Sequence, residues 1–149
     1  WQDCAQVFEE AGRSFLGAGA LGCAAPDQPN IDTLLRLATP AQRQRWLGPL
    51  VRGEVRSAFA MTEPAPGVGS DPRMVRTTGI VVARADEGVS WFLVDTANPG
   101  WRLLRNVPSI DPFAHGGHGE VRLENCRVGA DALIGEAGRG LDYAQLRLE

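Results

Sequence analysis

The chain contains no lysine: all 15 of its basic residues are arginines, set against 18 acidic residues. The resulting net charge of -3 argues against non-specific binding to nucleic acid, because that binding needs a basic surface. We interpret the arginines as a composition bias and not as a binding patch.

Cysteine and long apolar runs are also scarce. The three cysteines, Cys4, Cys23 and Cys126, are far apart and odd in number, which predicts buried or free thiols in a reducing compartment and no disulfide framework. The most apolar stretch, residues 16–25, is too short and too rich in glycine and alanine to cross a bilayer. The chain begins in mid-pattern at Trp1, so we expect a cut and not a processed N-terminus.

Helical spacing dominates the first third of the chain. Apolar residues recur every three or four positions over residues 1–16, which predicts one helix there, and residues 31–37 show a second such pattern. The sequence from Thr39 to Gln42 is a capping box, with threonine at the N-cap, proline at N1 and glutamine at N3. It predicts a third helix, which Gly53 ends.

From about residue 56 the periodicity becomes that of β-strands, and helical spacing returns only at residues 141–148. Helices followed by strands indicate an α+β fold and not a βαβ sheet. With 149 residues, 44% of them apolar, the chain can form one modest domain or parts of two. Residues 84–89, with Gly88, are expected to be a hairpin loop. The predicted strands cover residues 57–61, 79–83, 90–94, 101–107 and 120–124.

The most informative motif lies between Phe59 and Asp71. The sequence Phe-Ala-Met-Thr-Glu-Pro at residues 59–64 ends a predicted strand in a turn, and Gly-Ser-Asp follows at residues 69–71. Alone, Thr-Glu-Pro would indicate only a turn, in which threonine bonds locally and proline ends the ladder. Its neighbours add information: the capping-box helix precedes it, and residues 121–141 combine a strand with a glycine-rich entry into a helix.

In this order and spacing, the three segments resemble those of the acyl-CoA dehydrogenase family, over essentially the whole chain. The resemblance implies a helical segment followed by an antiparallel β-domain, either a barrel or a sandwich. Residues 1–56 would form part of the N-terminal α-helical domain, residues 57–134 the central β-domain, and residues 135–149 the start of the C-terminal helical domain.

The family removes the α-proton of an acyl-CoA thioester with a carboxylate base and passes the β-hydrogen as hydride to flavin. The resemblance therefore implies FAD as the cofactor, with Met61 and Thr62 hydrogen-bonded to the flavin pyrimidine edge. Phe59 would pack beneath the ring system. Gly69 would allow close backbone approach, and Ser70 would lie near the flavin phosphates or the acyl-CoA pantetheine.

The resemblance also implies partners and a location. They are an acyl-CoA substrate, an electron-transfer flavoprotein or a similar acceptor, and further copies of the full-length chain in a homo-oligomer. A cytoplasmic protein with no membrane span and no nucleic-acid partner is expected.

The chain departs from the family pattern in two places. Between Thr78 and Gly79 the family normally has a strand pair and a Trp-x-Thr/Ser segment that lies against the flavin, and neither is present. The family's catalytic base usually lies in the C-terminal domain, and Glu149 does not stand at the matching position, so no catalytic residue is assigned. We therefore expect no dehydrogenase turnover from the isolated chain.

Three alternatives follow from these departures and from the remaining motifs. The chain could be a non-enzymatic binding module of the same fold, or part of an acyl-CoA oxidase or a flavin monooxygenase.

A metal site is not expected, because His115 and His118 lie among glycines with only Cys126 as a nearby thiol.

Overall fold

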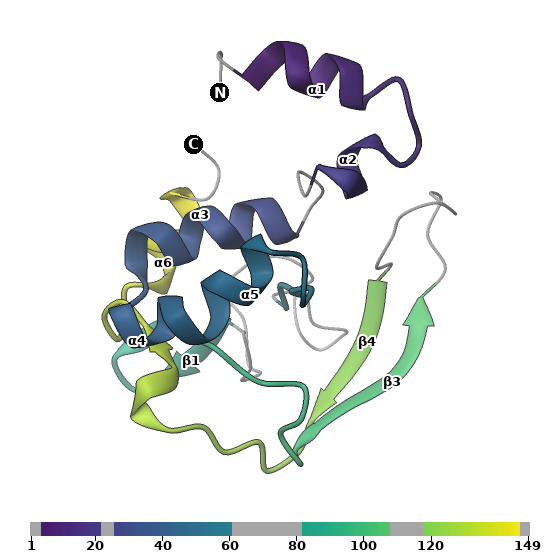
Figure 1. Ribbon diagram of the computed structural model, residues 1–149. Coiled ribbons are helices and arrows are strands. Elements are labelled where there is room, and N and C mark those ends of the chain that lie inside the picture. Colours follow the sequence, from purple (N-terminus) through teal and green to yellow (C-terminus); the bar gives the residue numbers. More distant parts are fainter. Residues whose placement is uncertain (1–3, 22–25, 61–81, 108–117, 147–149) are drawn as a thin grey trace.

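The computed structural model describes residues 4–21, 26–60, 82–107 and 118–146 (Figure 1). Within these ranges five α-helices precede the strands, a short 3-10 helix (Ala130–Ala132) precedes the last strand, and one α-helix follows, so the predicted α+β class is confirmed. The N-terminal helices are α1 (Ala5–Ala11), α2 (Gly17–Ala20), α3 (Asp27–Leu37), α4 (Pro40–Gln42) and α5 (Gly48–Val51).

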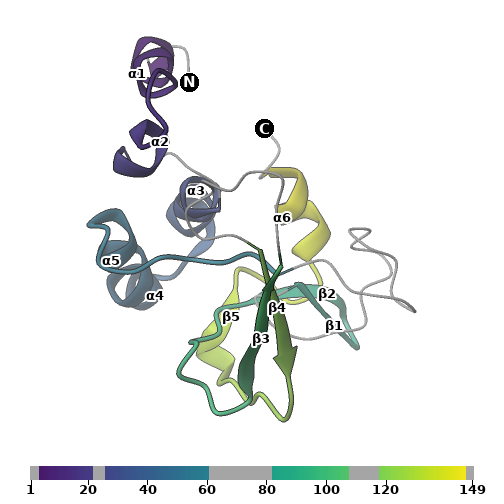
Figure 2. The same ribbon diagram turned by 90° about the vertical axis from the view of Figure 1, so that its right-hand side faces the viewer.

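The strands form two antiparallel sheets. One has three strands in the order β1-β2-β5, and the other pairs β3 with β4. Helix α6 closes the described chain, and in both Figure 1 and Figure 2 α3 lies between the three-stranded sheet and the helices α1 and α2. The bounds are β1 Val82–Ala85, β2 Gly88–Phe92, β3 Trp101–Val107, β4 His118–Leu123, β5 Leu133–Ile134 and α6 Gly140–Leu146.

Local sequence explains why the helices around residues 39–53 form as they do. Both halves of the capping box are present: the Thr39 hydroxyl accepts from the Gln42 backbone N–H, and the Gln42 side chain accepts from the Thr39 N–H. The helix then widens into a π-helical turn over Arg43–Leu47, which ends two residues before Pro49, a residue with no backbone N–H to donate. At its end, Gly53 has a φ of +70° and closes a Schellman motif.

Two sequence predictions are wrong. The helix predicted over residues 1–16 ends at Ala11, because Gly12 and Ser14 favour turns and the Ser14 hydroxyl accepts from the Leu16 N–H. The strand predicted over residues 57–61 does not form where the structure describes it: residues 57–59 are irregular, and Ala60 makes only an isolated bridge. Met61 lies outside the described residues.

The hairpin of β1 and β2 is confirmed, but its loop is shorter than the predicted residues 84–89. Ala85 pairs with Gly88, which leaves a two-residue turn, Asp86 and Glu87. Gly88 therefore belongs to the strand, where its φ is +121°. The strand predicted over residues 101–107 is confirmed without change as β3.

The hydrophobic core joins the helices to the three-stranded sheet. Trp91 on β2 is 1% exposed, and its indole packs between side chains from both parts of the fold. The principal buried apolar residues are Leu34, Leu47, Leu50, Val82, Val89, Trp91, Leu93, Ile134 and Tyr143.

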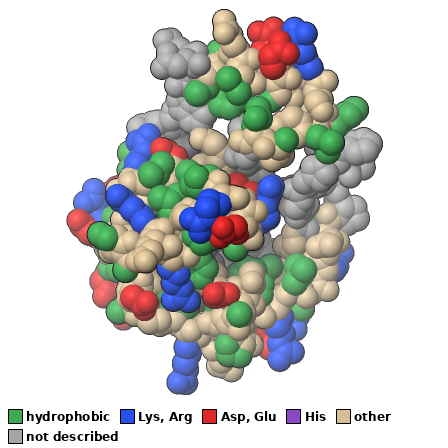
Figure 3. All heavy atoms as spheres, viewed as in Figure 1, with side chains coloured by type: hydrophobic (Ala, Val, Ile, Leu, Met, Phe, Trp, Pro, Cys, Tyr) green, Lys and Arg blue, Asp and Glu red, His purple; other side chains and the backbone are tan. Residues whose placement is uncertain are grey.

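On the face shown in Figure 3, arginine and acidic side chains are interspersed, and no single sign of charge dominates it. Among the described residues, none of the helices has both the length and the apolar character that crossing a bilayer would need.

Candidate functional site

A pocket of about 390 Å³ lies where α3, α5 and the segment that follows them meet strand β2. Its walls are mostly apolar and include four aromatic residues, and polar side chains from several segments also line it. Residues that define it include Asn30, Thr33, Trp46, Pro49, Ser57, Phe59, Trp91, Leu93, Asp95 and Trp101. A concave apolar pocket with few polar groups is typical of a small-molecule site.

Phe59 is the one predicted cofactor-binding residue that the structure describes, and it lines this pocket. Its ring meets the ring of Trp91 edge to face, with centroids 5.3 Å apart and planes at 66°. Trp91 in turn meets Tyr143 of α6 at 6.1 Å and 79°. This aromatic row connects the pocket wall to the core and to the last helix, so the position of the Phe59 ring is coupled to both.

The other predicted contacts cannot be placed around this pocket. Met61, Thr62, Gly69 and Ser70 lie outside the described residues, and their roles stay predictions. His115 also lies outside them. Among the residues that the structure describes, no group of three or more histidine, cysteine, aspartate or glutamate side chains could hold a metal ion.

Asp27 forms a buried polar network at one side of the pocket. Its carboxylate is part of a residue only 5% exposed, and Oδ1 accepts from both the backbone N–H and the hydroxyl of Ser57, each at 2.7 Å. Its Oδ2 lies 2.8 Å from Nε of Arg56. Asn30, one turn further along α3, donates from Nδ2 to the Ser57 hydroxyl at 2.8 Å.

Sequence reasoning missed this network. Asp27 follows a proline at the start of a helix, a place where an aspartate is ordinarily a solvated residue beside the helix dipole. The only signal was the spacing of Asp27 and Asn30, which places two short polar side chains on one face of α3. Which segment that face would meet could not be read from the spacing.

Exposed charges lie near the pocket opening. Arg45 and Asp95 both line the pocket, with Nη2 and Oδ2 separated by 3.8 Å, and the Arg45 guanidinium lies 4.7 Å from the centroid of the Trp46 ring. Because both charged side chains are substantially exposed, this pair contributes little to stability. Beyond the pocket, a hydrogen bond from Arg52 lowers the pKa of the Glu54 carboxyl.

Known proteins resemble the chain in sequence. FadE2, a probable acyl-CoA dehydrogenase of Mycobacterium tuberculosis, is 36% identical over 162 residues, which take in 87% of this chain and 40% of that protein. Acyl-CoA dehydrogenase family member 10 of Mus musculus is 32% identical over 180 residues, which take in 97% of this chain and 17% of that protein. The chain thus spans less than half the length of these relatives. No family model matches it.

Both alignments are longer than the part of the chain that they take in. In the first, 87% of 149 residues is about 130, so about 32 of the 162 positions have no counterpart here. In the second, 97% is about 145, which leaves about 35 of the 180 positions. The relatives are therefore longer within the matched region. That the difference falls after Thr78 stays a prediction.

Solved structures agree with the sequence comparison. A Mycobacterium abscessus protein assigned as an acyl-CoA dehydrogenase superposes with a TM-score of 0.81 at 30% identity, covering 97% of this chain and 44% of that one. Butyryl-CoA dehydrogenase of Megasphaera elsdenii gives 0.77 at 21%, covering 95% and 44%. A structure described as the electron transferring flavoprotein of Acidaminococcus fermentans gives 0.71 at 22%, covering 90% and 45%. The last two similarities establish the fold alone. Over the length that it spans, the chain is therefore similar to acyl-CoA dehydrogenases in sequence and in fold.

Proposed function

We propose that this chain supplies the part of an FAD-dependent acyl-CoA dehydrogenase that lies against the flavin. The reaction served is the α,β-dehydrogenation of an acyl-CoA thioester. The observation that carries the proposal is the aromatic-lined pocket that contains Phe59, two residues before the Met61-Thr62 motif, in a chain 36% identical to a probable acyl-CoA dehydrogenase.

The size and the lining of the described pocket support a flavin ring as its ligand. Its volume, about 390 Å³, lies within the usual range for small-molecule sites, and its walls are mainly apolar and aromatic. Such walls exclude water and contact a flat ring over a large area. When bound, FAD would accept the β-hydrogen of the substrate as hydride.

The residues of this chain would have distinct roles. Phe59 would form the wall beneath the ring. Met61 and Thr62 would donate hydrogen bonds to the pyrimidine edge, where donors stabilise negative charge. Gly69 would let the backbone approach the ligand closely, and Ser70 would contact the flavin phosphates or the pantetheine of acyl-CoA.

The wider assignments are part of the same proposal. Residues 1–56, 57–134 and 135–149 would belong to the N-terminal helical, central β and C-terminal helical domains of the family. An electron-transfer flavoprotein or a similar protein would accept the electrons, in the cytoplasm, from a homo-oligomer of the full-length protein. Because no base is assigned within these 149 residues, the chain alone should bind flavin without oxidising acyl-CoA.

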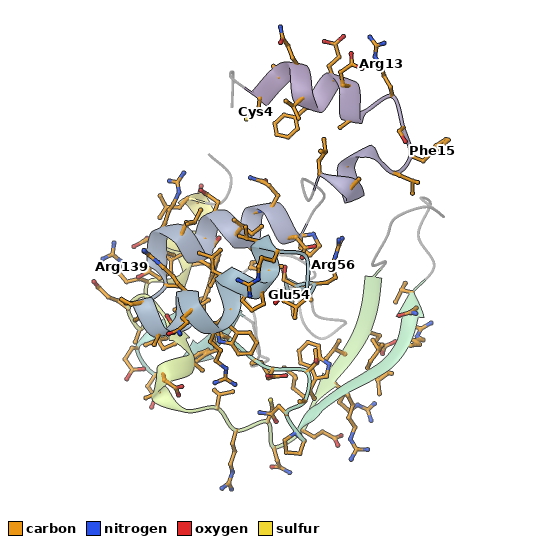
Figure 4. The ribbon with its side chains drawn as sticks, in the orientation of Figure 1. Cys4, Arg13, Phe15, Glu54, Arg56 and Arg139 are labelled. Carbon is orange, nitrogen blue, oxygen red and sulfur yellow. The ribbon has the colours of Figure 1, made fainter. Side chains whose placement is uncertain are left out.

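Titration of the purified chain with FAD, followed by the visible absorbance of bound flavin, tests the proposal. We expect saturable binding that Phe59→Leu weakens roughly tenfold, a usual cost of removing one well-packed aromatic contact. The matched control is Phe15→Leu, an identical change at a side chain that is 82% exposed and far from the pocket (Figure 4). Absence of flavin binding, or equal weakening by both changes, would contradict the proposal.

A second function is favoured by one observation, the deficit of about 32 alignment positions relative to FadE2. If those positions include the family's flavin-facing strand pair, the chain would be a non-enzymatic module that binds acyl-CoA or a partner protein. Calorimetric titration with a non-reactive acyl-CoA thioether separates the two functions. Binding of the thioether without any binding of FAD would support the module.

A further inference from the structure

We propose that Asp27 and Ser57 are positioning residues for Phe59, and that they thereby set where the flavin-facing wall of the pocket stands. The inference rests on the proposed function for the identity of the ligand. The contacts that hold Phe59 are independent of it.

The network binds three consecutive residues to one turn of α3. Arg56 is held through its side chain, which Figure 4 shows beside the start of α3. Ser57 is held through both its backbone N–H and its hydroxyl by the carboxylate of Asp27. Asn30 reaches Ser57 at 2.8 Å and the carbonyl oxygen of Ala58 at 3.4 Å. Backbone and side-chain groups are thus fixed together, which restrains both the path and the rotation of the segment.

Helix α3 is itself held in place by packing and hydrogen bonds, so it can restrain the segment. Leu34 on the same helix is 5% exposed within the core, and the Thr33 hydroxyl donates to the carbonyl oxygen of Pro29 at 2.8 Å. Asp27 and Asn30 are themselves buried, with exposed fractions of 5% and 9%. Short, buried side chains that are hydrogen-bonded have few alternative rotamers, so their partners have few alternative positions.

The restraint acts close to Phe59. Only Ala58 separates Phe59 from Ser57, and a chain extends by at most about 3.6 Å per residue, so the anchored Ser57 confines the Phe59 Cα to within about 7 Å. On its other side the Phe59 ring packs on Trp91. The backbone directly before Phe59 is therefore held by α3, and the Phe59 ring packs on β2.

The chemistry of the network also indicates positioning. Burying a carboxylate has a large desolvation cost, and a well-packed apolar side chain at the same place is often as stabilising or more so. What the carboxylate offers instead is direction, because two charge-assisted hydrogen bonds from Ser57 fix one backbone geometry. The segment makes no regular strand over residues 57–59, so these bonds replace the ladder that would otherwise define its path.

The test compares Ser57→Ala and Asp27→Asn with the conservative variant Ser57→Thr. Phe59 is observed directly, by the ring resonances of labelled phenylalanine in the folded chain, assigned with Phe59→Leu. The control is Thr39→Ala, which removes a helix cap remote from Phe59 and so lowers stability without touching the network.

We expect Ser57→Ala and Asp27→Asn to shift the Phe59 resonances toward those of free phenylalanine, as the ring leaves the edge of Trp91. The dissociation constant for FAD should rise roughly tenfold, the factor expected for one lost charge-assisted hydrogen bond. Ser57→Thr keeps the hydroxyl and should leave the Phe59 resonances and the dissociation constant for FAD near those of the unaltered chain. Thr39→Ala should lower the unfolding midpoint while leaving the Phe59 resonances in place.

Failure of the inference and failure of the proposed function give different results. If the unaltered chain bound no FAD, the proposed function would fail, and the Phe59 resonances would still decide the positioning. If Asp27→Asn did not fold, Ser57→Ala, which keeps the carboxylate, would decide it. Resonances unmoved in folded Ser57→Ala, or displaced equally by Thr39→Ala, would overturn the inference.

Discussion

The side-chain amide of Gln42 donates a hydrogen bond to the carbonyl oxygen of Leu133 at 2.8 Å, across 91 positions of the sequence. The same nitrogen donates to the carbonyl oxygen of Asp131 at 2.7 Å. Gln42 therefore completes the capping box through its side-chain oxygen. Its side-chain nitrogen links the helical region to strand β5 by a hydrogen bond. One buried side chain serves local and tertiary structure together.

The two roles of Gln42 can be separated by substitution. Gln42→Glu keeps the acceptor for the Thr39 N–H but loses both donated bonds and places a carboxylate against two carbonyl oxygens. We expect a loss of about 2 kcal/mol in the free energy of unfolding, near 1 kcal/mol per lost bond, measured by urea denaturation. Gln44→Glu, at an exposed neighbour, is the control and should be nearly neutral. A neutral Gln42→Glu would show that only the cap matters.

Gly100 and Gly53 should respond differently to alanine. A Cβ at Gly100 would lie 2.4 Å from the Cα of Cys126, a contact that only backbone movement could relieve. We expect Gly100→Ala to cost about 2–3 kcal/mol through overpacking. At Gly53 nothing lies within 4 Å, and the cost, about 1 kcal/mol, comes from the φ of +70° alone. Thermal unfolding of both variants checks the order, and a larger loss at Gly53 would contradict it.

The stability of the chain should depend on the size of the side chain at residue 91 and not on the indole N–H of Trp91. Its Nε1 is buried and has no hydrogen-bond partner within the described parts of the chain. Trp91→Phe removes this donor and keeps a ring between Phe59 and Tyr143, so we expect a loss of about 1–2 kcal/mol. Trp91→Ala leaves a cavity and should cost about 3–5 kcal/mol. Equal losses in chemical denaturation would mean that the N–H has a partner.

Cys126 should be a slow nucleophile at neutral pH. Burial raises the pKa of its thiol, so the reactive thiolate is less abundant than in a free cysteine. Iodoacetamide should therefore alkylate Cys126 more slowly than the exposed Cys4 at pH 8, as followed by peptide mass spectrometry. Faster labelling of Cys126 would contradict this expectation.

The same thiol gives stability a pH dependence of known sign. A pKa raised on folding means that the folded chain holds the proton more tightly. The contribution of the protonated thiol to stability is therefore complete at a pH below the pKa of Cys126 in the unfolded chain. It is lost as the pH rises through the pKa of Cys126 in the folded chain. Between pH 8 and pH 10 the unaltered chain should lose more stability than Cys126→Ala. A parallel decline of the two would show that Cys126 does not contribute.

Local sequence determined much of this protein. The threonine, proline and glutamine of residues 39–42 specify a helix start, because their groups satisfy the first N–H donors without help from elsewhere. The apolar spacing of residues 31–37 and the β-rich residues 101–107 likewise predicted elements that form. The motif at residues 59–71, taken with the capping-box helix before it and residues 121–141 after it, predicted the similarity to acyl-CoA dehydrogenases, since that pattern depends on residue types at fixed spacing and not on any contact.

Tertiary structure decided what these elements do to one another. A strand is predicted over residues 57–61, yet the Ser57 N–H and the Ala58 carbonyl oxygen bond to Asp27 and Asn30 of α3. Likewise, nothing near Gln42 in sequence indicates that Leu133 would be its partner. Hydrogen bonds between distant segments exist only once packing brings those segments together, and no local pattern encodes that meeting. The pocket beside Phe59 is a product of the same packing.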